Sequence, residues 1–333
     1  MKQLFVAWAA FQRRSVSLRD HFDFELEFIS LSFKHRLLRP LEYILKSGST
    51  LSLFIRRQPK VIWLQLPPTL LLYLSYFYQQ VFNPKTIIIA DCHNATFREP
   101  WIKLPYVVPL LNRCDLVLVH SEQVEKQAEH LGIHRELICF LEDPPPVIEA
   151  ASEMSLEGSP DRYTHPWVLC PCSFNRDEPI AELLKAARLA PDITFVVTGK
   201  SSRAKGVHDL SDIPSNVKLP GFLPLEVFNN LLLKTDVVLG LTKLDGIQLS
   251  VAVEATGIGT PMVLSNTSLL RKLFYKGAVY VNSDDPTSIA QGCHQALLKH
   301  DTLAKQVCEL KEERRSHWLE QTSRVKKLLV QAR

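Results

Sequence analysis

Short apolar runs rich in β-branched residues alternate with helical patterns along the whole of this chain. Strands bounded by helices at this spacing are typical of parallel sheets built from right-handed crossovers. We therefore predict an α/β fold. The expected strands are Leu4–Ala9, Phe24–Ile29, Val61–Leu66, Thr86–Ala90, Leu116–Val119, Leu137–Phe140, Trp167–Cys170, Thr194–Thr198, Val217–Leu219, Val237–Leu241, Pro261–Leu264 and Ala278–Val281. The expected helices are Leu37–Arg56, Thr69–Phe82, Pro179–Ala190, Leu225–Leu233, Leu249–Gly257 and Pro286–Lys299.

A break in this alternation divides the chain. Three prolines follow Asp143, and a polar stretch leads from them to a second series of strands that begins at Trp167. A length of 333 residues also suits two domains. We predict two Rossmann-like, doubly wound domains facing a cleft, at residues 1–147 and 166–300. Residues 148–165 would link them, and residues 301–333 would form a helix that packs back on the junction.

The composition favours a protein of a reducing compartment. Seven cysteines occur, an odd number, and no Cys-x-x-Cys pair is present. We expect buried thiols and no disulfide framework. Cys170 and Cys172 lack further metal ligands, so no metal or other cofactor is predicted. No basic segment precedes the apolar residues 1–10, so a signal peptide is not expected.

One long apolar stretch, Val61–Phe82, could span a membrane by its length. Prolines and glutamines interrupt it, so we favour a strand followed by a buried helix.

The net charge of +4 is unevenly distributed. Residues 1–60 contain 11 Lys or Arg and 5 Asp or Glu, a balance of +6, and the remainder sums to −2. Basic clusters at Arg13-Arg14, Lys34–Arg39 and Arg56-Arg57 indicate an anionic membrane surface or a phosphate-bearing acceptor. A solvated basic face without a partner is the alternative. No basic helix interleaved with aromatic residues favours nucleic acid.

The first candidate site follows the strand Thr86–Ala90. Ligands of open α/β sheets bind beyond the carboxyl ends of strands, where Asp91 and Asn94 flank His93. A neutral imidazole can both donate and accept hydrogen bonds, so His93 is the candidate to meet a sugar hydroxyl or the reacting centre. Glu99 and Trp101 could form an acceptor wall. The alternative is that Asp91 and Asn94 only cap the turn.

The second candidate is Gly199-Lys200, at the end of a predicted strand. Glycine lets the backbone approach a ligand closely, and lysine offers a compact cation for a diphosphate. No Walker A motif is present. A surface lysine in a turn is the alternative.

The third candidate is the segment Leu244–Ala255, which follows a predicted strand and opens a helix. Free N–H groups at a helix N-terminus bind phosphate oxygens. Glu254 could accept hydrogen bonds from two adjacent hydroxyls, as on a ribose. The alternative places Glu254 on a solvated face of an ordinary crossover.

At these residues the chain resembles the retaining, nucleotide-sugar-dependent GT-B glycosyltransferases of family 4. Gly199-Lys200, Leu219–Phe222, Thr235–Gly240 and Glu254–Pro261 follow the order of that family's donor domain. Pro261–Val281 resembles bacterial members associated with surface polysaccharides. Asp91–Asn94 and Asp115–Ser121 resemble the acceptor domains of these members, and Asp91–Asn94 also resembles the first mannosyltransferase of lipid-linked N-glycan assembly.

Two positions depart from the family pattern. The family has two glutamates separated by seven residues. The later one matches Glu254, but Gly246 stands at the earlier position and Asp245 is the nearest carboxylate. The family's basic residues after the first donor-domain strand have no match in Ser173–Glu178, where Arg176 could substitute.

The resemblance implies hexosyl transfer from a UDP- or GDP-sugar to a glycan or lipid-linked acceptor, with retention of configuration and without an obligatory metal. The second domain would bind the donor and the first the acceptor, in the cytoplasm, at the inner face of a membrane. A GT-B-fold sugar-nucleotide epimerase and a catalytically decayed partner subunit remain as alternatives. The implied catalytic residues are His93 and Asp245. The implied donor-binding residues are Gly199, Lys200, Gly221, Phe222, Asp245, Gly246, Gln248, Leu249, Ser250 and Glu254, and the implied acceptor-side residues are Asp91, Asn94, Glu99, Trp101, Arg13 and Arg14.

Overall fold

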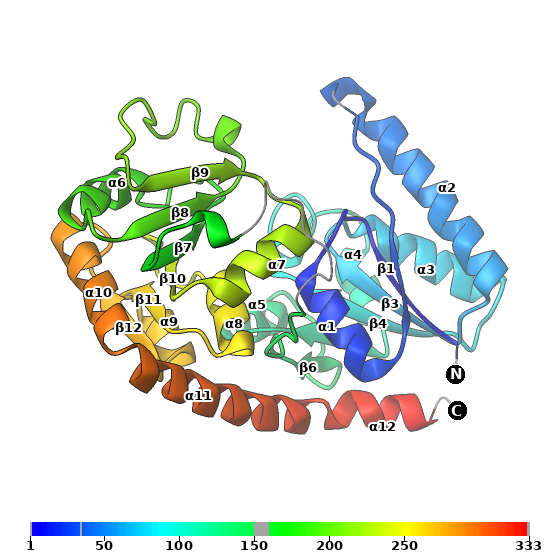
Figure 1. Cartoon of the computed structure of the whole chain (residues 1–333). Coiled ribbons are helices and arrows are strands. Elements are labelled where there is room, and N and C mark those ends of the chain that lie inside the picture. The colour runs from blue at the N-terminus through cyan, green and yellow to red at the C-terminus, as the bar shows by residue number, and fades with distance from the viewer. Residues whose placement is uncertain (1, 34, 150–159, 332–333) are drawn as a thin grey trace. The chain divides into compact units, whose positions relative to one another are not determined.

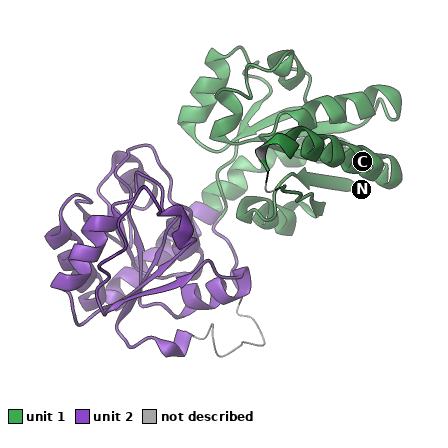
Figure 2. Ribbon diagram, turned by 90° about the horizontal axis from the view of Figure 1, so that it is seen from above, with its two compact units in different colours: residues 1–144, 316–333 green, residues 145–315 purple. Residues whose placement is uncertain are grey.

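The computed structural model describes residues 2–33, 35–149 and 160–331. Residues 150–159 of the predicted linker and Lys34 of a predicted basic cluster lie outside these ranges. The chain forms two compact units, one of residues 1–144 and 316–333 and the other of residues 145–315 (Figure 2). We call them unit 1 and unit 2.

Unit 1 is a six-stranded parallel sheet with the order β2-β1-β3-β4-β5-β6 (Figure 1). Its strands are β1 (Gln3–Ala7), β2 (Glu25–Phe28), β3 (Val61–Leu66), β4 (Ile87–Cys92), β5 (Leu116–Val119) and β6 (Ile138–Phe140). Its helices are α1 (Arg13–Phe22), α2 (Arg39–Arg57), α3 (Leu70–Val81), α4 (Val107–Leu111), α5 (Glu122–His130) and α12 (Ser323–Gln331).

Alternating side chains of β1 build the two cores of unit 1. Leu4 and Val6 pack with apolar residues of α2 to α5 on one face of the sheet. Phe5 and Ala7 pack on the other face with residues of α1 and α12. The period of two along the strand thus buries both faces, as a doubly wound sheet requires.

Unit 2 is a second six-stranded parallel sheet, with the order β12-β11-β10-β7-β8-β9. Its strands are β7 (Trp167–Pro171), β8 (Thr194–Thr198), β9 (Val217–Gly221), β10 (Val237–Gly240), β11 (Met262–Ser265) and β12 (Ala278–Val281). Its helices are α6 (Ile180–Leu189), α7 (Leu225–Lys234), α8 (Ser250–Ile258), α9 (Ser268–Leu273), α10 (Pro286–Leu298) and the first part of α11 (His300–Gln321).

Helices cover both faces of this second sheet. Residues of α6 and α10 pack on one face, and residues of α7, α8, α9 and α11 pack on the other. The strand order is that of a Rossmann fold, in which the chain reverses direction between β7 and β10. A ligand crevice is expected beyond the carboxyl ends of those two strands.

The predicted α/β fold of two doubly wound domains is confirmed, and all twelve predicted strands are present. Three boundaries need correction. Asp91 and Cys92 belong to β4 rather than following it, because both extend the pairing with β3. β9 continues to Gly221. The third candidate segment begins its helix at Ser250, so Gly246 precedes the helix N-terminus by a full turn.

The stretch Val61–Phe82 folds as β3 followed by α3, as predicted. Within the described residues, no helix is both long and apolar enough to span a bilayer.

Candidate functional site

A buried guanidinium organises the carboxyl edge of the sheet in unit 1. Arg14 enters from the first turn of α1 and donates to both carboxylate oxygens of Asp91, at 3.0 and 3.2 Å. It also donates to Asp143 at 2.6 Å and to the carbonyl of Leu141 at 3.0 Å. Burial alone would lower the pKa of Arg14. The charges and hydrogen bonds of its two carboxylate partners outweigh this effect and raise the pKa above its ordinary value, so the guanidinium stays charged.

His93 lies next to this ion cluster. Its backbone N–H donates to the carbonyl of Leu66 at the end of β3, and its Nε2 lies 2.5 Å from the side-chain nitrogen of Gln12. Burial lowers the pKa of His93, against the charge of Asp91, which raises it. The imidazole is therefore neutral near pH 7 and keeps one nitrogen able to accept a proton.

A second imidazole, His120, stands beside His93, with the ring centroids 5.5 Å apart. Burial lowers the pKa of His120 to about 4, and the charge of Arg14 acts in the same direction. The pKa of Asp143 is raised by burial, but Arg14 lowers it below its ordinary value. The edge thus holds two neutral histidines over a fixed, ionised Arg–Asp cluster.

Sequence reasoning singled out Asp91, His93 and Arg14 but not Gln12, His120 and Asp143 as site residues. His120 follows β5 directly, as His93 follows β4, and these two strands are neighbours in the sheet. A polar residue after each of two adjacent parallel strands is a signal that could have found His120. Gln12 precedes α1 without any periodic pattern to mark it.

The other predicted acceptor-side residues have separate environments. Arg13 lies over the ring of Phe11. Glu99 is exposed and pairs with Lys103. Trp101 packs against Tyr43 of α2. Asn94 begins a short 3-10 helix, and its buried side-chain oxygen has no hydrogen-bond partner within the part of the chain that the structure describes.

In unit 2 the predicted donor residues gather at the carboxyl edge of the sheet. The backbone N–H of Gly199 donates to the carbonyl of Gly221, which joins the ends of β8 and β9. Gly199 has a φ of +133°, and an added Cβ would lie 2.0 Å from the carbonyl oxygen of Cys172. Only glycine fits there. Phe222, next to Gly221, is 80% exposed, so its ring face is open to a planar ligand.

The loops after β7 and β10 are also joined. The Thr242 hydroxyl donates to the Asp177 carboxylate at 2.9 Å, and the Lys243 N–H donates to the Asp177 carbonyl at 2.7 Å. These contacts hold together the two loops that border the expected crevice between β7 and β10.

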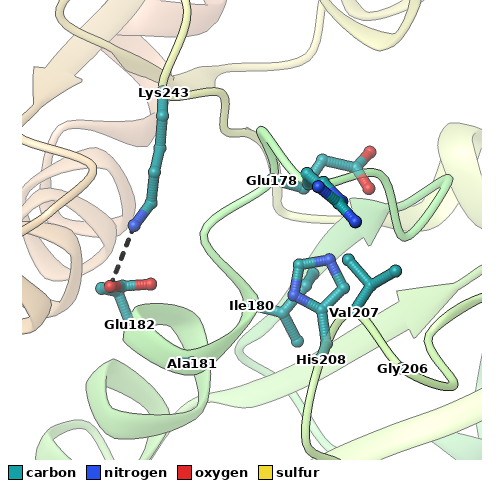
Figure 3. A pocket seen from close by; sticks show the side chains of 9 residues that line it. Glu178, Ile180, Ala181, Glu182, Gly206, Val207, His208 and Lys243 are labelled. Atoms are coloured by element: carbon teal, nitrogen blue, oxygen red, sulfur yellow. Dashed lines mark hydrogen bonds and ion pairs between the residues drawn. The ribbon is translucent and has the colours of Figure 1, made fainter.

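A pocket of about 330 Å³ lies beside these loops (Figure 3). Lys243 reaches Glu182 on one side of it, and His208 lies opposite Glu178 on the other. Its lining residues are Arg176, Glu178, Ile180, Ala181, Glu182, Gly206, Val207, His208 and Lys243.

The cations of this edge differ in what they are free to bind. Lys243 pairs with Glu182 and Asp284, whose hydrogen bonds raise its pKa. Arg176 and Lys200 have no ion pair within the described residues. Both are therefore available to an anionic ligand.

The carboxylates of the third segment have distinct roles. Asp245 accepts hydrogen bonds from the Ser268 hydroxyl and from the N–H groups of Leu269 and Gly246, and the Ser268 bond lowers its pKa most. It thereby holds the start of α9. Glu254 is only 8% exposed on α8, so the solvated-face alternative is wrong.

The helix α8 begins without a side-chain cap, because its N-cap residue Leu249 makes no capping bond. The N–H groups of Ala252 and Val253 donate to the Leu249 carbonyl. The N–H groups of Ser250 and Val251 precede them at the helix N-terminus, where a backbone N–H has no intrahelical acceptor. Gln248 precedes them in the loop. No cluster of three or more His, Cys, Asp or Glu side chains suited to a metal occurs in the described ranges.

Comparison with known proteins places this geometry in context. Residues 176–329 match the family model described as glycosyl transferase-like. A sequence comparison with curated proteins gives no match.

Several solved structures share the fold of the whole chain. Anabaena HepE in complex with UDP and glucose is 15% identical, with 99% of this chain and 100% of that chain covered and a TM-score of 0.69. Sucrose-phosphate synthase from Thermosynechococcus elongatus is 14% identical, with 99% of each chain covered and a TM-score of 0.66. A Listeria monocytogenes structure assigned as a UDP-N-acetylglucosamine 2-epimerase is 13% identical, with coverage of 92% and 91% and a TM-score of 0.58.

The two parallel sheets and these similarities identify the chain as a protein of GT-B fold whose residues 176–329 match the glycosyl transferase-like family.

Proposed function

We propose that this protein transfers a hexose from a UDP- or GDP-sugar to a glycan or lipid-linked acceptor, with retention of configuration. The observation that carries the proposal is the convergence of donor-binding features on one sheet edge of unit 2. These features are the close Gly199–Gly221 contact, the exposed Phe222, the available cations Arg176 and Lys200, and the uncapped start of α8. They lie within or beside the segment that matches the glycosyl transferase-like family.

In this proposal the nucleotide base stacks on Phe222, and Glu254 accepts hydrogen bonds from the ribose hydroxyls. Lys200, Arg176 and the first N–H groups of α8 meet the charge that develops on the leaving diphosphate. The protein's own cations would supply this stabilisation without a metal. UDP is the nucleotide in the HepE complex, which favours it as the first to test.

Unit 1 would bind the acceptor. His93, held by Gln12 and the Arg14–Asp91 pair, would hydrogen-bond a hydroxyl of the sugar or of the acceptor. Asp245 would assist by facing the sugar or its phosphates, in addition to holding α9.

The test is incubation with a panel of UDP- and GDP-sugars, followed by chromatography of the products. Slow hydrolysis of one donor to nucleoside diphosphate and free sugar supports a transferase. Interconversion of two nucleotide-sugars would instead indicate an epimerase, the function assigned to the Listeria structure of the same fold. Absence of binding to every donor would indicate a decayed subunit and refute the proposal.

Substitution of Lys200 by Ala links that activity to the site. Loss of a charge-assisted contact to phosphate should weaken nucleotide binding by about tenfold to a hundredfold. Lys205→Ala is the matched control, because Lys205 is also an exposed lysine of the loop after β8. Equal effects of the two substitutions would contradict the assigned phosphate site.

A further inference from the structure

The carboxyl edge of unit 1 holds a second imidazole, His120, that the proposed function does not use. β4 and β5 are adjacent parallel strands, in which Asp91 pairs with Leu118. His93 and His120 each follow this pair by two residues, so their rings lie side by side where the strands end. The register of the sheet therefore places both rings at the edge where ligands of open α/β sheets bind.

The two rings keep hydrogen-bonding capacity for a ligand. Nε2 of His93 is occupied by the Gln12 amide, but 30% of the His93 side chain is exposed. His120 is half-buried, and neither of its ring nitrogens has a hydrogen-bond partner within the described residues. A neutral imidazole offers one donor and one acceptor. A ligand at this edge can therefore both donate to His120 and accept from it.

The cation at this edge is committed to the protein itself. Among the charges that act on both rings, the positive one is Arg14. Its side chain is only 4% exposed, and it donates to Asp91, to Asp143 and to the carbonyl of Leu141. An anionic ligand could reach the guanidinium only by breaking a buried ion pair, which is strongly unfavourable.

The ionised groups of this edge sum to one negative charge. Asp91 and Asp143 are two carboxylates around one guanidinium. Burial raises the pKa of Asp143, but Arg14 lowers it below its ordinary value, so this carboxylate stays ionised. A fully ionised phosphate would therefore be repelled here. It also has no hydrogen to donate to the acceptor nitrogen of His120, whereas a hydroxyl group has one.

We propose that unit 1 selects an uncharged sugar ring as its acceptor, and that His120 determines this specificity by binding a hydroxyl group of that ring. The inference rests on the proposed function and deepens it, because it excludes transfer directly onto a phosphate group. It also revises an expectation from the sequence. The cluster Arg13-Arg14 indicated a phosphate-bearing acceptor, but the charge of Arg14 is balanced within the protein.

The experiment is binding of acceptor fragments to the full chain without any donor, measured by NMR of the histidine rings. Methyl α-glucoside, α-galactoside and α-mannoside are each compared with the 6-phosphate of the same sugar, at a slightly alkaline pH that ionises the phosphate fully. EDTA is present to remove any metal ion that could bridge the two rings. We expect at least one uncharged glycoside to shift the His93 and His120 signals. Its phosphate should bind at least about tenfold more weakly.

Substitution of His120 tests its contact with the sugar. His120→Leu should weaken binding of the preferred glycoside about tenfold, measured on the His93 signal, because the hydroxyl group loses its partner. His120→Gln should restore part of the affinity, since an amide also donates and accepts. His130→Leu is the control, at an exposed histidine in the last turn of α5, which ends at the amino edge of the sheet.

Substitution of Asp143 tests the charge selectivity. Asp143→Asn removes the excess negative charge, so it should abolish most of the discrimination against the phosphate and change the affinity for the glycoside little. A purely structural role would move both affinities together. Glu136→Gln, at an exposed acid of the same unit, should leave the discrimination unchanged. Melting temperatures show which variants fold, and the wild-type selectivity decides the question without them.

The measurement needs no donor, so the two proposals fail separately. Tighter binding of the phosphates to the wild type, no shift of either histidine signal with any sugar, or equal losses in His120→Leu and His130→Leu would overturn the inference. Any of these results together with intact donor hydrolysis would leave the transferase in place. Selective binding of a glycoside by a chain that binds no donor would refute only the proposed function.

Discussion

Glu254 is the carboxylate on which the proposed ribose contact depends. It is buried on α8, close to the helix N-terminus that would bind phosphate. We expect Glu254→Gln to weaken binding of the preferred nucleotide about tenfold to a hundredfold, because a carboxylate accepts hydroxyl hydrogen bonds more strongly than an amide does. Isothermal calorimetry with UDP and GDP measures this. An unchanged affinity with an unchanged melting temperature would remove Glu254 from the site.

Substitution of His93 should affect turnover and leave nucleotide affinity almost unchanged. His93 belongs to unit 1, whereas the donor features belong to unit 2. His93→Ala is therefore expected to reduce turnover by at least about a hundredfold, the usual scale for loss of acid–base or positioning help, with little change in nucleotide affinity. His134→Ala, at an exposed histidine of the same unit, is the control. Parallel losses in turnover and affinity would argue against the assigned role.

His120 should make stability depend on pH. Its pKa is about 4 in the folded chain and 6.5 ordinarily, so the unfolded chain binds more protons between these values. Stability is then complete above about pH 6.5 and declines as the pH falls toward 4. Urea unfolding across that range should show a smaller decline for His120→Gln than for the wild type. The same decline in both proteins would assign the titration to other groups.

At the scale of elements, the end of β8 depends on a single glycine. Gly199→Ala would place a Cβ 2.0 Å from the Cys172 carbonyl oxygen at a φ of +133°. We expect a loss of stability of more than about 1–3 kcal/mol, because a clash with backbone adds to the conformational strain. Gly206→Ala is the control, since Gly206 has a φ of +78° but no atom within 4 Å of an added Cβ. Thermal unfolding should separate the two, and equal melting temperatures would contradict the argument.

Most strands could be predicted because they are short apolar runs buried on both faces, which leaves a continuous apolar signal. β2 is an exception, since none of its four residues is fully buried. Some helices could not. In α1 the buried face includes Arg14 and Ser15, which hide the apolar period. In α5 only Val124 and Ala128 are buried, too few to mark a face. Local pattern therefore located the sheets more reliably than the shorter helices around them.

Part of the candidate site could be predicted because the ends of the predicted strands locate the carboxyl edge of each sheet. Residues that follow strands, such as His93, can be placed at the carboxyl edge from the sequence alone. The partners of Arg14 could not be derived, because Asp91 and Asp143 lie 77 and 129 residues away along the chain. The sequence resemblance implied a catalytic role for Asp245. In the structure Asp245 also contacts Ser268 and Leu269 at the start of α9, a structural role that could not be derived before the position of this later helix was known.

At the scale of the whole molecule, Trp318 completes the core of unit 1 from the end of α11. It is buried against Phe22, and its indole N–H donates to the Glu142 carbonyl at 2.9 Å. Trp318→Ala should cost unit 1 about 3–5 kcal/mol, the usual loss for a large aromatic truncated to Ala. Leu319→Ala, at a neighbour that is 41% exposed, should cost far less. Chemical denaturation followed by circular dichroism measures both, and similar midpoints would disprove the role of Trp318.

The return of residues 316–333 to unit 1 governs the order in which the two units can fold during synthesis. Residues 145–315 are contiguous, so unit 2 has all its strands and helices as soon as Arg315 leaves the ribosome. Unit 1 begins first but lacks Trp318, Val325 and Leu329, which line one of its two cores. The usual rule that the N-terminal domain matures first is therefore inverted here. The half that we propose to bind the acceptor becomes complete last, after the half that we propose to bind the donor.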